Sequence, residues 1–256
     1  MTLLAIFLAT LSGGVLSVLL AASLSISWLS RFADRMVAFA VGVMLCTALT
    51  NLIPEALESG LDPHEAGFAV LVGMLVFFGL EKVALWRHDH GHRHAGKAHH
   101  SPQRAAPQVA LIVIGDGLHN LVDGILIAAA FLTDPALGWG TALAVLAHEI
   151  PQELGDFLVM LDAGLSRQRA LTLNALSGLT MPLGGLLGYL GLIRLEPLIP
   201  YVLALSAASF LYIAVADLIP ELHQHRTAKN GWVQITLLLL GVTTVTLIGM
   251  TLPHAH

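Results

Sequence analysis

Long apolar stretches dominate this sequence and constrain what it can fold into. A helix needs about 20 predominantly apolar residues to cross the hydrocarbon core of a bilayer. Eight stretches meet this requirement, at roughly residues 2–28, 36–57, 66–86, 109–132, 138–162, 170–192, 197–221 and 231–252. Only 11% of the residues are charged, whereas soluble domains carry about 25%. The sequence therefore predicts an all-α polytopic membrane protein with eight transmembrane helices, forming a single transmembrane domain over residues 1–256.

Basic residues between the apolar stretches predict the orientation of the chain. Lys and Arg accumulate in short loops on the cytoplasmic side of a membrane. Of the 12 Lys and Arg residues, all except Arg194 lie in or beside connections that an eight-span topology places on one face. We therefore expect both termini outside and the polar connection 87–107 in the cytoplasm, in a bacterial inner (cell) membrane. This connection is rich in histidine, with His88, His90, His92 and His94 as candidate metal-capturing residues.

A short motif occurs twice, as NLIPE at residues 51–55 and DLIPE at residues 217–221. The predicted topology places the two copies at opposite faces of the membrane. Such placement is typical of an inverted repeat, here of spans 1–3 and 6–8 around spans 4 and 5, as in many transporters. The alternative is two helices that merely end alike. The polar members Asn51, Glu55, Asp217 and Glu221 are candidates for attracting cations to vestibules.

Ionisable residues are concentrated in the fourth stretch. Asp116, His119, Asn120 and Asp123 are spaced i, i+3, i+4 and i+7, so they form one stripe along a helix. A charged side chain at the centre of a membrane costs about 2.5–3.5 kcal/mol on insertion scales. Such residues therefore face protein or water, and they are functional candidates.

The fifth stretch carries a second concentration of polar side chains at similar depth: His148, Glu149, Gln152, Glu153 and Asp156. Imidazole nitrogen combined with carboxylate and amide oxygen suits a borderline divalent ion such as zinc. The alternative is a set of hydrogen bonds between helices. The number of histidines and carboxylates at one depth favours a metal site.

An enzyme is the competing class, because His148 and Glu149 begin the HExxH pattern of zinc proteases. That pattern needs a second histidine at i+4, where this sequence has Gln152. Pro151 also disfavours the straight helix that such a pair requires. We therefore predict that the protein is not an enzyme, with an intramembrane metalloprotease-like enzyme or a metal-selective channel as alternatives.

The two polar stretches resemble motifs of the ZIP (Zrt/Irt-like, solute carrier family 39) metal transporters. HNLVDG at residues 119–124 is similar to the HNxxDG motif of that family. HEIPQELGD at residues 148–156 is similar to the HExPHExGD motif of its LIV-1 branch. The resemblance implies a primary metal site from His119, Asp123, His148 and Gln152, with Asn120 and Glu149 beside it for a second site.

Two residues depart from the family pattern. Gln152 stands where the LIV-1 motif has its second histidine, and Met181 stands where many bacterial members have a glutamate of the second site. Amide oxygen and thioether are weaker zinc ligands than the groups they replace. Asp116, Glu153, Asp156 and Met181 are therefore taken as residues of the pathway or of a secondary site.

The resemblance also implies what the protein does. It implies uptake of Zn²⁺ toward the cytoplasm as transported substrate, with Cd²⁺, Fe²⁺ or Mn²⁺ as further possibilities and no organic cofactor. The resemblance also implies an elevator-like movement of spans 1, 4, 5 and 6 against spans 2, 3, 7 and 8. It further implies a homodimer within the lipid bilayer and no nucleic-acid partner. Because histidine must be neutral to bind metal, we expect affinity to fall as the pH drops through about 6 to 7.

Overall fold

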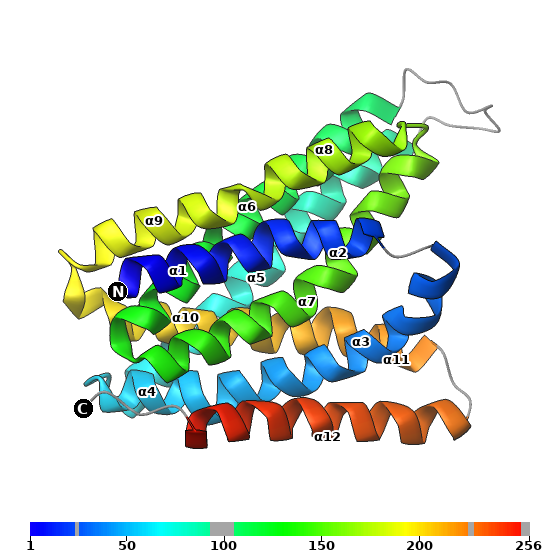
Figure 1. Ribbon diagram of the computed structural model, residues 1–256. Helices are drawn as coiled ribbons and strands as arrows, with labels where there is room; N and C mark the ends of the chain where they lie inside the picture. Colours follow the sequence, from blue (N-terminus) through cyan, green and yellow to red (C-terminus); the bar gives the residue numbers. More distant parts are fainter. Residues whose placement is uncertain (24–25, 93–104, 225–227, 252–256) are drawn as a thin grey trace.

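The computed structural model describes residues 1–23, 26–92, 105–224 and 228–251, and over these residues every regular element is a helix (Figure 1). In chain order the elements are α1 (Thr2–Leu11), the π-helix η1 (Ser12–Leu16), α2 (Ser17–Ser23), α3 (Ile26–Cys46), the π-helix η2 (Thr47–Leu52), α4 (Ile53–Glu58), α5 (Pro63–His92), α6 (Ala105–Thr133), α7 (Pro135–Asp162), α8 (Arg167–Gly178), α9 (Thr180–Leu192), the 3₁₀-helix η4 (Glu196–Leu198), α10 (Ile199–Tyr212), the π-helix η5 (Ile213–Leu218), α11 (Ile219–Gln224) and α12 (Ala228–Thr251). The all-α prediction is confirmed for the described residues.

Six helical stretches among the described residues are long and apolar enough to cross a membrane: Thr2–Leu20, Arg35–Glu58, Ile112–Thr133, Arg167–Leu192, Glu196–His223 and Gly231–Thr251. Two further stretches of the eight-span prediction correspond to α5 and α7. In α5 the apolar part, Pro63–Gly79, is shorter. Helix α7 has 28 residues but includes the acidic residues of the HEIPQELGD motif, which lower its mean hydropathy. The count of eight therefore stays a prediction.

The polar connection predicted at residues 87–107 is shorter in the structure. Helix α5 continues to His92, and α6 begins at Ala105. A helix with i→i−4 hydrogen bonds can extend beyond its apolar segment, because its backbone groups are satisfied internally. The backbone of His88, His90 and His92 thus belongs to α5, whereas His94 lies outside the described residues.

Helix α7 lies inside the bundle, which explains how a helix with several acidic residues is accommodated. Figure 1 shows α7 between α6, α8 and α9 on one side and α3 and α12 on the other. Its start is fixed by Asp134, whose carboxylate accepts hydrogen bonds from the backbone N–H groups of Ala136 (2.7 Å) and Leu137 (3.0 Å). Pro135 follows at the first helical position, where its missing N–H costs nothing.

We divide the helices into two groups, and close approaches through glycine occur within each. The α7 group consists of α1, η1, α2 and α6–α9, and the α3 group consists of α3, η2, α4, α5, α10, η5, α11 and α12. A Cβ atom on Gly14 would overlap the carbonyl oxygen of Gly178, and one on Gly184 would overlap that of Leu121; both contacts lie within the α7 group. In the α3 group a Cβ on Gly42 would overlap the carbonyl oxygen of Leu238. Small residues allow this proximity between membrane helices.

The two copies of the repeated motif have the same local structure. The second π-helix, η2, is followed directly by α4, which has Pro54 as its second residue. The third, η5, is followed directly by α11, which has Pro220 as its second residue. Proline has no N–H and its ring would clash with the carbonyl four residues earlier, so a widened turn before each proline accommodates it. Figure 1 shows α4 and α11 toward opposite ends of the bundle.

Candidate metal centre

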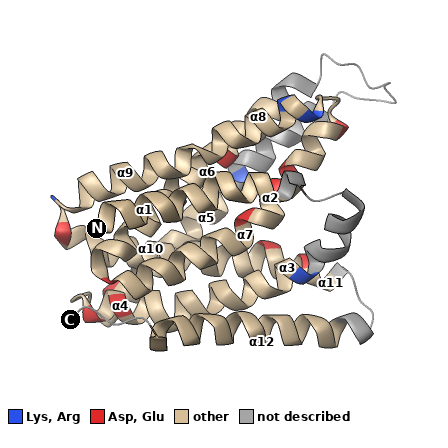
Figure 2. Ribbon diagram, in the orientation of Figure 1, with Lys and Arg blue, Asp and Glu red and all other residues tan. Residues whose placement is uncertain are grey.

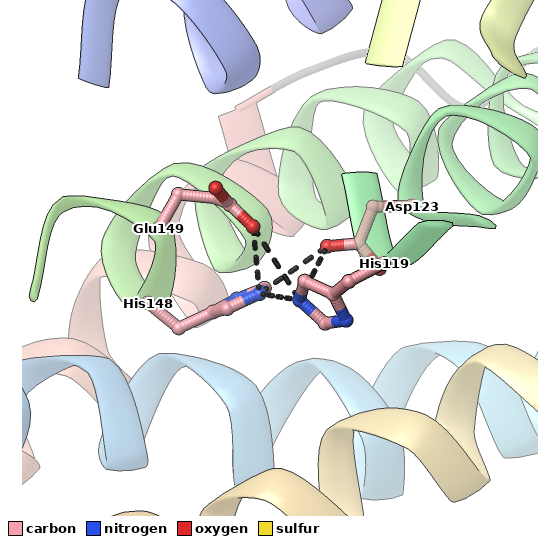
Figure 3. A group of neighbouring side chains, drawn as sticks. All are labelled: His119, Asp123, His148 and Glu149. Carbon is pink, nitrogen blue, oxygen red and sulfur yellow. Dashed lines mark hydrogen bonds and ion pairs between the residues drawn. The ribbon is translucent and has the colours of Figure 1, made fainter. Parts of the chain in front are cut away.

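Four side chains from two neighbouring helices converge inside the bundle (Figure 3). Helix α6 contributes His119 and Asp123, one turn apart, and α7 contributes the consecutive residues His148 and Glu149. The Nε2 atoms of the two histidines are 3.3 Å apart. We call these four residues the histidine cluster.

The spacing of the ligand atoms in the histidine cluster suits a single small cation. The Nε2 atom of His148 is 3.2 Å from Asp123 Oδ2 and 3.6 Å from Glu149 Oε1. The Nε2 atom of His119 is 3.6 Å from Asp123 Oδ2 and 3.4 Å from Glu149 Oε1. Ligands at bond lengths of about 2.0–2.1 Å around tetrahedral zinc stand about 3.3–3.4 Å apart. Two nitrogens and two oxygens could therefore hold zinc with movements of a few tenths of an ångström.

A backbone contact orients His148 for metal binding. Its Nδ1 lies 3.0 Å from the carbonyl oxygen of Ala144, so Nδ1–H donates to that oxygen. The lone pair of the neutral ring is then on Nε2, which faces the cluster. The ring of Phe210, on α10, lies edge to face against His148 at 6.2 Å between centroids. This contact provides an apolar wall from the α3 group.

The carboxylates of the histidine cluster lack hydrogen-bond donors. Asp123 and Glu149 are fully buried, and none of their four carboxylate oxygens has a hydrogen-bond partner. A buried charge without compensation costs several kcal/mol. Because the side chain of His119 is 21% exposed, the cluster can be reached past this residue. A divalent cation would supply the missing compensation.

The two amide side chains predicted for the site lie on a neighbouring carboxylate. Asn120 Nδ2 donates to Asp116 Oδ1 at 3.0 Å, and Gln152 Nε2 donates to the same oxygen at 3.2 Å. Glu149 is the fourth member of the histidine cluster. Gln152, which the resemblance counts among the primary ligands, has its amide nitrogen engaged by Asp116.

A second group of acidic residues adjoins the first. Asp116, Glu149 and Glu153 each present a carboxylate oxygen within 4.8 Å of the others, and we call them the carboxylate cluster. All three are buried. Asp156 lies one turn beyond Glu153 on α7 and is half-buried. Figure 2 shows acidic positions, in red, inside the bundle as well as at its ends.

Met181 is part of the helix packing. It is fully buried, and a Cβ on Gly13 would lie 2.6 Å from its Sδ. The glycines of η1 thus leave room for this side chain, which occupies the contact between η1 and α9. This packing role is the one that the structure describes for the thioether.

The remaining candidates lie toward the two ends of the bundle. Asn51 and Glu55 line a pocket of about 530 Å³ together with Glu58 and Asp134. Asp217 and Glu221, in η5 and α11, are exposed. The sequence alone did not identify the pocket-lining role of Asp134 or the contact of Phe210, because both depend on which helices meet. The side chains of His88, His90, His92 and His94 lie outside the described residues.

Comparison with known proteins identifies the family of the chain. The family model of the ZIP zinc transporters matches residues 1–110 and 86–249. The chain is 38% identical over 153 residues to the zinc transporter foi of Drosophila melanogaster, covering 59% of this chain and 22% of that protein. It is 39% identical over 121 residues to human zinc transporter ZIP6, covering 47% of this chain and 16% of that protein.

A third relative is similar over more of the chain. The metal cation symporter ZIP14 of Xenopus tropicalis is 29% identical over 253 residues, which cover 73% of this chain and 54% of that protein. The chain thus spans only part of the length of each of these relatives. ZIP6 and ZIP14 belong to the LIV-1 branch, in agreement with the motif on α7. With the family match extending over almost the whole sequence, the chain belongs to the ZIP zinc transporter family, whose members are transporters and not enzymes.

Proposed function

We propose that the protein is a zinc-preferring transporter that moves divalent cations toward the cytoplasm and holds the ion at the histidine cluster. The observation that carries this proposal is the convergence of two imidazole nitrogens and two buried carboxylates inside the bundle, with N–N and N–O distances of 3.2–3.6 Å. The family match supports a metal ion as the substrate. Asn120 and Gln152 complete the surroundings of the ion through their contacts with Asp116.

The donor set supports a preference for zinc. Imidazole and carboxylate together suit Zn²⁺ and neighbouring transition metals, whereas Ca²⁺ takes six or more oxygen ligands. Cd²⁺, Fe²⁺ and Mn²⁺ are further substrates on this proposal. Since Gln152 replaces a nitrogen donor of the family motif, the site binds the ion less tightly than a three-histidine site would, which favours release.

The proposed arrangement in the membrane has eight spans, with α5 and α7 added to the six apolar stretches. Helix α7 is shielded from lipid by its neighbours, so its acidic residues do not prevent it from spanning. Arg167 and Arg169 begin α8 at one end of the bundle, and Arg194 follows α9 at the other. With the basic-rich end in the cytoplasm, both termini lie outside a bacterial cell membrane, and the histidines of residues 88–94 can receive the released metal.

The close packing supports an elevator-type movement of the α7 group against the α3 group. At several described glycines, an added Cβ would come within 3.0 Å of a neighbouring helix. In each case that helix belongs to the same group as the glycine. In the described part of the chain, one glycine contact crosses between the groups. A Cβ on Gly140 would lie 3.7 Å from Asn51 Nδ2, which is an ordinary van der Waals distance. Each group would therefore move as one body, carrying the ion on α6 and α7. The family resemblance further supports a homodimer.

The proposal is tested by uptake of radioactive zinc into proteoliposomes. His119→Ala or Asp123→Ala removes a ligand, so we expect uptake to be abolished while the protein remains folded, as judged by helical content and gel filtration. His64→Ala, an exposed histidine at the start of α5, is the matched control and keeps the activity of the unaltered protein. Undiminished uptake by the His119 and Asp123 variants would refute the assignment.

A further inference from the structure

We propose that Phe210 of α10 is a positioning residue for the metal centre: it holds the ring of His148 and so links the affinity for the ion to the arrangement of the two helix groups. The inference rests on the proposed function and adds to it a residue that binds no metal itself. Phe210 contacts the histidine cluster from the α3 group, whereas the four members of the cluster belong to the α7 group.

The contact between Phe210 and His148 crosses the boundary between the two groups. The ring centroids are 6.2 Å apart and the ring planes are inclined at 63°, which is an edge-to-face arrangement. Helix α10 packs against α6 as well as against α5 of its own group. Another edge-to-face pair, Phe131 with Trp139, joins α6 to α7 within the α7 group. A movement between the groups would therefore break the Phe210 contact and leave the Phe131 pair intact.

Phe210 fills the space beside the imidazole. Its side chain is the bulkiest of the fully buried side chains in the described part of the chain. It belongs to the same apolar core as Ala144 and Ala147, which precede His148 on α7. Alanine side chains leave space next to the imidazole for a large ring. Because His148 is only 1% exposed, the imidazole has little freedom to turn while Phe210 is in place.

Two contacts hold the ring of His148, and they respond differently to a movement between the groups. The hydrogen bond from Nδ1–H to the carbonyl oxygen of Ala144 lies within α7, so it persists in every arrangement. The contact with Phe210 exists only while α10 faces this part of α7. Outer contacts of this kind orient metal ligands. The Nε2 atom, 3.2 Å from Asp123 Oδ2, is therefore held most firmly in the arrangement that the structure shows.

Ion binding and the arrangement of the groups then depend on each other. If the ion binds more tightly while Phe210 holds His148, the ion must favour the arrangement with this contact by the same factor. The loss of one edge-to-face contact changes a binding constant by roughly two- to tenfold. A factor of this size does not trap the ion. Separation of Phe210 from His148 lowers the affinity and so aids release.

The test compares two matched substitutions in the purified full chain. Phe210→Leu keeps an apolar side chain but removes the ring, so we expect the Kd for zinc, measured by calorimetry in detergent, to rise about two- to tenfold. In proteoliposomes KM rises likewise and kcat does not fall, because binding is weakened and the movement is not. Phe131→Leu removes the ring from the edge-to-face pair inside the α7 group. It is the matched control and keeps the Kd and KM of the unaltered protein.

A double variant separates a role through His148 from a general effect on packing. In His148→Ala the imidazole is absent, so adding Phe210→Leu should leave the remaining zinc affinity unchanged, whereas an independent packing effect would lower it further. Phe210→Met, a second side chain without a ring, should give the same Kd as Phe210→Leu. Helical content and gel filtration verify that each variant is folded.

Three results would overturn the positioning role: an unchanged Kd and KM in Phe210→Leu, an equal loss in Phe131→Leu, or a further loss in the double variant. None of them bears on the proposed function, because zinc uptake that depends on His119 would still support a transporter. The absence of zinc uptake by the unaltered protein would instead overturn the proposed function.

Discussion

At the scale of single residues, the site combines charged ligands with amides that control a neighbouring carboxylate. His148 is oriented by the backbone of Ala144, and Asp116 is held by Asn120 and Gln152. Gln152 is therefore more than a weakened ligand at the position of a histidine in the family motif. Its amide donates to Asp116 of the carboxylate cluster, and it lies one turn after His148 on α7.

The first prediction concerns Gln152→His, which restores the family motif. A third imidazole adds a strong nitrogen donor and removes a hydrogen bond from Asp116, so we expect tighter zinc binding and a lower kcat for uptake. Calorimetry and proteoliposome uptake measure the two effects. Gln168→His, on the exposed face of α8, should change neither. Weaker zinc binding by Gln152→His would show that this position does not adjoin the ion.

The second prediction concerns pH. Protonation of an imidazole removes the lone pair that binds metal, so zinc binding by the histidine cluster is strong at neutral pH and weakens as the solution becomes acidic. Binding at neutral pH must also release any protons that the ligands carry. Calorimetry in two buffers with different ionisation enthalpies detects this release, and titrations at several pH values give the affinity. An affinity that is insensitive to acid would argue against histidine ligands.

At the scale of elements, backbone contacts through glycine fix the pairs of helices that carry the site. Helices α6 and α9 approach so closely at Gly124 and Gly184 that an added Cβ on either would meet the backbone of the other helix. This contact sets the position of α6, and with it His119 and Asp123. The polar residues of α6 can therefore face α7 without being displaced toward lipid.

The third prediction compares two glycines of α9. Gly184→Ala places a methyl group against the carbonyl oxygen of Leu121, and overpacking of this kind costs about 1–3 kcal/mol. We expect a lower unfolding temperature in detergent and weaker zinc binding. Gly191→Ala is the control on the same helix, because a Cβ there has no neighbour within 4 Å. Equal stability of the two variants would contradict the close α6–α9 contact.

At the scale of the whole molecule, the two groups of helices meet around α7. The α7 group carries the four residues of the histidine cluster, and the α3 group provides Phe210 against His148 and part of the pocket lined by Asn51 and Glu55. In the proposed mechanism, movement between the groups would open the site to one side of the membrane and then to the other. In the proposed topology the pocket is at the outer end, where its carboxylates would attract cations before they reach the site.

The fourth prediction tests movement between the groups by cross-linking. In a chain with Cys46→Ala, the pair Asn51→Cys and Gly140→Cys joins the two groups, since a Cβ on Gly140 would lie 3.7 Å from Asn51 Nδ2. We expect oxidation to stop zinc uptake and reduction to restore it. As a control, Thr246→Cys pairs with the native Cys46 inside the α3 group, where the Cys46 Sγ and Thr246 Oγ1 atoms are 3.9 Å apart, and keeps its uptake. Full uptake by the oxidised Asn51–Gly140 pair would exclude the movement.

The sequence by itself determined that the chain is helical and apolar and which residues share a helical stripe, because hydropathy and the 3.6-residue period are local properties. It also identified the family, through the motifs that begin at His119 and His148. The tertiary structure decided that Glu149 joins the two histidines, that the amides of Asn120 and Gln152 bind Asp116, and that Met181 packs against Gly13. These outcomes depend on how each helix is rotated about its axis and how closely it approaches its neighbours. Contacts between distant parts of the chain set the rotation and the approach, because local periodicity does not specify them.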